Sequence, residues 1–70
     1  MVMTTYTDLD QALANPTDVT ELKLENNKLT ELPPEIGQLT NLSSLNLRWN
    51  NLSDEAKEEV KQLLPNCEII

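Results

Sequence analysis

The sequence lacks most of the residue types on which catalytic and metal centres depend. Its 70 residues include no His, no Phe, one Gly and one Cys. The single thiol, Cys67, cannot form an intrachain disulfide, and there is no imidazole to activate it as a nucleophile. Gly37 alone cannot build a glycine-rich phosphate loop. We therefore expect a protein without enzymatic activity, cofactor or metal ion.

Positive charge is also scarce, with five Lys and Arg residues against twelve Asp and Glu and a net charge of -7. Nucleic acids and anionic membranes bind clustered cations, so neither is an expected partner. Residues 1–6 have neither the basic nor the apolar region of a signal peptide, and no apolar run reaches transmembrane length. Together with the unpaired Cys67, these features predict a soluble protein of the reducing cytoplasm.

What the chain does contain is an internal repeat. The residues Val19, Leu22, Leu24, Asn27 and Leu29 recur 23 positions later as Leu42, Leu45, Leu47, Asn50 and Leu52. Both copies follow the pattern L-x-x-L-x-L-x-x-N-x-L, with Val in the first position of the first copy. A fixed period of this length is typical of repeats that stack and bury a continuous apolar core.

The repeat pattern resembles that of leucine-rich repeat proteins. The segment 32–39, with Pro33-Pro34 and a single Gly, is similar to the outer part of 23-residue repeats in bacterial and plant intracellular members. Segments 9–19 and 63–69 resemble the terminal units of small bacterial members. The resemblance implies an α/β fold, a minimal solenoid forming a right-handed superhelix. It also implies a non-catalytic module that binds proteins on a concave face.

Three short parallel strands are expected, at 22–24, 45–47 and 67–70, where apolar residues alternate with polar ones. A helix is predicted over 5–15, with Thr5 as its N-cap and Asp8 completing a capping box. Asn15 ends this helix because a residue before proline avoids the α region. The first helix should bury Tyr6, Leu9, Ala12 and Leu13. A second helix begins at Ser53 and should bury Ala56, Val60, Leu63 and Leu64.

We interpret residues 1–70 as one domain. In this division 5–15 is an N-terminal cap, 19–41 the first repeat, 42–52 the start of the second repeat, and 53–70 a C-terminal cap helix with a closing strand. Residues 1–4 are expected to form a loose tail. Asn27 and Asn50 should point inward and satisfy backbone groups, and Gly37 should permit a bend.

Residues between the repeated leucines should face a partner on the concave side. The candidates are Glu21, Lys23, Glu25, Ser44, Asn46, Arg48 and Trp49. Arg and Trp are common in binding hot spots. Two alternatives stay open here, because Trp49 is as well suited to packing as to binding, and Arg48 is suited to an ion pair with Glu25 across the strands.

The function and assembly also have alternatives at this stage. Two repeats are fewer than the roughly three that a solenoid usually needs. The caps could compensate, the chain could be a trimmed or designed version, or copies could associate weakly through a strand edge. We expect a monomer that binds a protein partner. The alternative is a purely structural, designed or excised scaffold with no partner of its own.

Overall fold

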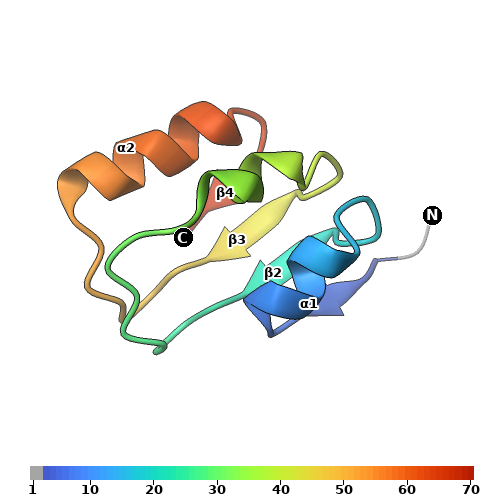
Figure 1. Cartoon of the computed structure of the whole chain (residues 1–70), viewed down its shortest axis with the longest axis horizontal. Coiled ribbons are helices and arrows are strands. Elements are labelled where there is room, and N and C mark those ends of the chain that lie inside the picture. Colours follow the sequence, from blue (N-terminus) through green and yellow to red (C-terminus); the bar gives the residue numbers. More distant parts are fainter. Residues whose placement is uncertain (1–2) are drawn as a thin grey trace.

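The computed structural model describes residues 3–70, which form a small parallel sheet covered on one face by helices (Figure 1). The strands are β1 (Thr5–Tyr6), β2 (Glu21–Lys23), β3 (Ser44–Asn46) and β4 (Glu68–Ile69), and they lie side by side in chain order. Every neighbouring pair is parallel. The predicted α/β solenoid is confirmed, but the described residues form four strands where the sequence predicted three.

Three helical segments connect the strands. They are α1 (Leu9–Ala14), the 3₁₀ helix η1 (Pro34–Gln38) and α2 (Asp54–Leu63). Both α1 and α2 pack against η1. Ser53 caps α2, since its hydroxyl accepts the Ala56 N–H at 3.1 Å, as its sequence position predicted. Pro33 and Pro34 favour the short 3₁₀ turn because a proline needs no N–H partner at a helix start.

The additional strand, β1, occupies the place where a helix start was predicted. Thr5 pairs with Glu21 and Tyr6 with Leu22, so the first helix begins only at Leu9. Its N-cap is Asp8 and not Thr5, because the Asp8 carboxylate accepts the Asp10 N–H at 2.9 Å. Pairing with β2 satisfies backbone groups that an exposed sheet edge would leave unpaired, and this tertiary gain outweighs a weak local helix signal.

The predicted loose tail is also partly wrong. The Thr4 N–H donates to the Thr20 hydroxyl at 2.6 Å, and the Thr4 carbonyl accepts the Thr20 N–H at 3.0 Å. Thr4 therefore belongs to the ordered start of the sheet. Residues 1–2 of the predicted tail lie outside the described residues.

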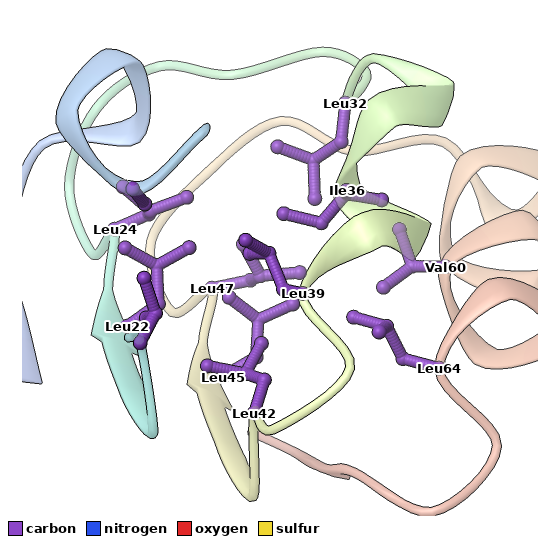
Figure 2. Packing of buried hydrophobic residues seen from close by; sticks show 12 residues of the cluster. Leu22, Leu24, Leu32, Ile36, Leu39, Leu42, Leu45, Leu47, Val60 and Leu64 are labelled. Atoms are coloured by element: carbon purple, nitrogen blue, oxygen red, sulfur yellow. The ribbon is translucent and has the colours of Figure 1, made fainter. Parts of the chain in front are cut away.

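The core lies between the sheet and the helices, and it is almost entirely aliphatic. Leu22, Leu45 and Ile36 have no solvent exposure, and Figure 2 shows their side chains among those of the neighbouring leucines. Ala12 of α1 and Val60 of α2 belong to the same cluster. A 70-residue chain with two repeats therefore buries one continuous core that extends from the first helix to the last.

Two predictions about α2 and η1 are corrected by their packing. Leu63, predicted to be buried, is 39% exposed, because the apolar face of α2 turns Val60 and Leu64 inward. Gly37 does not have a positive φ, so the chain does not bend there through a glycine-only conformation. A Cβ at Gly37 would lie 3.3 Å from the Leu63 Cδ2 atom, so the small residue instead allows η1 and α2 to approach closely.

Candidate functional site

The sheet has one face turned away from the helices, and polar side chains project from it. We call this surface the sheet face and define it by six strand residues: Thr5, Glu21, Lys23, Ser44, Asn46 and Glu68. The register places Thr5, Glu21, Ser44 and Glu68 in one row across the four strands, and Lys23 beside Asn46 in the next. The predicted candidates Glu21, Lys23, Ser44 and Asn46 are thus brought together on rigid elements.

Contacts within the sheet face are few and exposed. The Thr5 hydroxyl donates to the Glu21 carboxylate at 3.2 Å. The Lys23 ammonium lies 3.9 Å from the same carboxylate, and half of the Lys23 side chain is exposed. Ion pairs of this kind contribute about 0–1 kcal/mol, so these side chains are held loosely.

Glu25, Arg48 and Trp49 lie beyond the strand ends and not on the sheet face. The Asn26 N–H donates to the Arg48 carbonyl at 2.9 Å, which holds the two turns side by side. The predicted ion pair between Arg48 and Glu25 is not formed. Ion pairs within 4.0 Å in the described part of the chain are Lys23–Glu21 and Lys61–Glu58.

Arg48 and Trp49 line a groove of about 360 Å³ at the rim of the sheet, between the turn after β3, helix α2 and the end of β4. We call it the rim groove. Its lining includes Arg48, Trp49, Lys57, Lys61, Ile69 and Ile70. Sequence reasoning missed both lysines, which were assigned only to the solvent face of the second helix. Their separation of four residues puts them on one helix face, but nothing local indicates which strand end that face adjoins.

Trp49 is both exposed and conformationally disfavoured. Its side chain is 72% exposed, and its φ is 60°. Asn26 occupies the same position of the first repeat, with a φ of 59°. The left-handed conformation costs an ordinary residue roughly 1–2 kcal/mol, and Asn is one of the few residues that adopt it readily. The repeat therefore demands a left-handed residue at a position where this chain has its only Trp.

Comparison with known proteins identifies the repeat. Residues 17–59 match the family model described as leucine-rich repeats in two copies. The chain belongs to the leucine-rich repeat family. A leucine-rich repeat protein of Leptospira interrogans has a similar solved structure, with 38% identity and a TM-score of 0.75. The match covers 97% of this chain but only 17% of that one. The search of curated proteins returned no match.

The repeat asparagines of this leucine-rich repeat protein play unequal parts. The Asn50 amide nitrogen donates to the carbonyls of Leu24, at 2.8 Å, and Leu47, at 3.0 Å. Its oxygen accepts the N–H groups of Asn27 and Leu29. Asn27, predicted to point inward, is exposed, and its side chain donates only to the Glu25 carbonyl. Within residues 3–70, β1 and α1 precede the turn of Asn27 and supply no equivalent turn beside it, whereas Asn50 has the first repeat as its neighbour.

The remaining reactive groups have an unreactive environment. Burial, and secondarily the charge of Glu68, raises the pKa of the Cys67 thiol, which disfavours the nucleophilic thiolate. Within residues 3–70, no cluster of three or more His, Cys, Asp or Glu side chains has the arrangement of a metal site. Helices in this same range are too short or too polar to cross a bilayer.

Proposed function

We propose that this leucine-rich repeat chain is a non-catalytic module that binds a protein partner on the sheet face. The observation that supports the proposal most directly is the strand register. It aligns Glu21 with Ser44 and Lys23 with Asn46, so that four side chains with different hydrogen-bonding properties project from one rigid surface. Strands fix the backbone positions of such groups before a partner arrives, which lowers part of the entropic cost of binding.

The composition of the surface fits a polar and reversible contact. Glu21 and Glu68 carry negative charge, Lys23 positive charge, while Ser44 and Asn46 are neutral donors and acceptors. A standard interface buries about 800 Å² per partner. Four strands of two or three residues offer a face that can only just reach this area, so we expect weak binding by the isolated chain.

The proposal includes the setting in which the module works. We propose that it is a monomer, that it acts in the cytoplasm and that it catalyses no reaction. The unpaired Cys67 with its raised pKa is compatible with a reducing compartment. The helices α1 and α2 are proposed to act as caps, since both contribute apolar residues to the ends of the shared core.

Site-specific photo-crosslinking tests the binding face. A photo-reactive residue is placed at Ser44, on the sheet face, and in a control chain at Glu35, which is exposed on η1 at the other side of the sheet. Irradiation in a lysate should give discrete protein adducts from position 44 alone. A Lys23→Glu substitution beside the probe should lower their yield. Equal adducts at both positions, or none, would reject the proposal and favour a scaffold without a partner.

A further inference from the structure

We propose that the rim groove binds a short acidic peptide segment, in which an apolar side chain is flanked by carboxylates. The apolar side chain would lie against Trp49 and Ile70, and the carboxylates would meet the cations Arg48, Lys57 and Lys61. This surface is separate from the sheet face, so the proposal does not depend on the function proposed above.

The charge distribution is the first argument for this occupant. The five basic residues of the chain are Lys23, Lys28, Arg48, Lys57 and Lys61, and the last three line the rim groove. The protein as a whole carries a net charge of -7. A local concentration of positive charge on an acidic surface gives a field that is complementary to a short anionic ligand.

These cations make few short ion pairs in the described part of the chain. Lys61 has Glu58 at 3.8 Å, but both side chains are more than 60% exposed, so the pair is weak. Arg48 and Lys57 take part in neither of the two ion pairs found within 4.0 Å among residues 3–70. An incoming carboxylate would therefore replace water around these two cations, and no internal ion pair would have to break.

The apolar lining is the second argument. Ile70, which is 42% exposed, and Trp49 are two of the four large apolar side chains exposed in the described chain, and both line the rim groove. Ile69 lies beside them, packed against the core. An indole next to guanidinium and ammonium groups provides one surface for an aliphatic or aromatic side chain and another for its charged neighbours.

The conformation of Trp49 gives a third, independent argument. At the equivalent position the first repeat has Asn26, which adopts the left-handed conformation with little strain. Trp49 adopts it with a bulky side chain that remains 72% exposed and so adds little to the core. A disfavoured residue that packs weakly is better explained by what it contacts in a complex than by the stability of the chain.

Size and charge together favour a peptide over larger anions. The groove measures about 360 Å³, near the lower end of the roughly 300–1,000 Å³ typical of ligand sites, so it admits a few side chains. A nucleic acid or an anionic bilayer would extend past the three cations onto the acidic remainder of the surface. A larger groove of about 760 Å³ lies beside η1 and is bordered by Glu31 and Glu59. The whole surface is rich in acidic residues, so the two glutamates at this larger groove do not indicate a particular ligand.

The emission of Trp49 provides a direct assay, because it is the only Trp in the chain. The probe is a short peptide with a central Leu-Leu flanked by Glu residues. Two control peptides replace either the Glu residues by Lys or the Leu residues by Ser. Titration with the acidic Leu peptide should shift the emission to the blue with saturation, since the indole leaves water. The Lys peptide should not bind, and the Ser peptide should bind at least about tenfold more weakly.

Variants locate the contact, with affinity measured by the anisotropy of a labelled peptide. Lys57→Glu and Lys61→Glu together should raise Kd by at least about tenfold, whereas Lys28→Glu, which reverses one charge away from the groove, should alter it less than about twofold. Trp49→Asn should raise Kd by about thirtyfold while the chain still folds, because Asn is the residue found at the equivalent position 26.

Several results would overturn the proposal. They are an unchanged Kd in the double lysine variant, an equal loss in Lys28→Glu, or equal binding of the Lys peptide. A blue shift that depends on protein concentration without peptide would assign the groove to a second copy of the chain. Tighter binding to vesicles of anionic phospholipid than to the peptide would assign it to a membrane. A Ser44→Ala variant, which changes the sheet face without altering charge, should leave peptide affinity unchanged, and this separates the test from that of the sheet face.

Discussion

The Asn50 side chain accepts the backbone N–H of Asn27 at 2.9 Å, although the two asparagines occupy the same position in successive repeats. One asparagine thus holds the turn that contains the other. The Asn27 side chain does not hold the turn of Asn50 in return. It donates only to the Glu25 carbonyl, within its own turn. The Asn50 side chain thus adds to the backbone bonds that join the two repeats at this rim, from Asn26 to Arg48 and from Asn51 to Leu29.

Replacing Asn50 by Ala should lower the free energy of unfolding much more than replacing Asn27 by Ala. Asn50→Ala leaves two carbonyls and two N–H groups without their partner, so we expect the free energy of unfolding to fall by about 2–4 kcal/mol. Asn27→Ala should cost less than about 1 kcal/mol. Urea unfolding followed by circular dichroism measures both, and equal losses would contradict the one-sided arrangement.

Exchanging the residues at the two left-handed positions, 26 and 49, tests the cost of this backbone conformation. Trp49→Asn should raise the free energy of unfolding by about 1 kcal/mol, because Asn accepts a φ of 60° that Trp disfavours. Asn26→Trp should lower it by a similar amount at the matching position. For a chain of this size each change corresponds to a shift in Tm of about 4–8 °C, measurable by thermal unfolding. A lower Tm for Trp49→Asn would show instead that the indole packs usefully.

The substitution Gly37→Ala tests whether η1 and α2 leave room for a methyl group between them. Gly37→Ala reduces the conformational freedom of the unfolded chain, which favours folding by about 0.4–1 kcal/mol where the site accepts a methyl group. The nearest atom, at 3.3 Å, is the end of the Leu63 side chain, which is partly exposed and can move. We expect a small net stabilisation in urea unfolding. Destabilisation by more than 1 kcal/mol would mean that the two helices must separate.

The pKa of Tyr6 should be sensitive to the contact between β1 and the segment before β2. Its hydroxyl donates to the Asp18 carboxylate at 2.7 Å, and this hydrogen bond, with desolvation and the charge of Asp18, raises the pKa of Tyr6. The pKa in the folded chain lies above the unfolded value of about 10, so the contribution to stability is complete below pH 10. It is lost as pH rises through the folded pKa.

An ultraviolet absorbance titration of this single tyrosine measures the effect. The tyrosinate midpoint should lie above 10 in the wild-type chain and move down in Asp18→Ala. Circular dichroism at each pH establishes that the chain is still folded. Identical midpoints in the two chains would show that the hydroxyl is hydrated and does not donate to Asp18 in solution.

The parts of the fold that follow a period or a local signal were predictable. The recurrence of Leu22 and Leu45 predicts two buried strand positions, and Ser53 before two acidic residues predicts the start of α2. The start of the first helix was not predictable in the same way. Thr5 and Asp8 make an acceptable local cap, but Thr5 pairs with Glu21, sixteen residues away, and no local pattern records that pairing.

The candidate site also has a part that the sequence predicts and a part that depends on tertiary packing. Because side chains alternate along a strand, the sequence alone determined that Glu21, Lys23, Ser44 and Asn46 share one face. Only the tertiary structure decided that Arg48 and Trp49 line one groove together with Lys57 and Lys61 of α2. A repeat period determines what each residue does within its own coil. Packing between coils, which depends on helix rotation and long-range contacts, determines which neighbours it has.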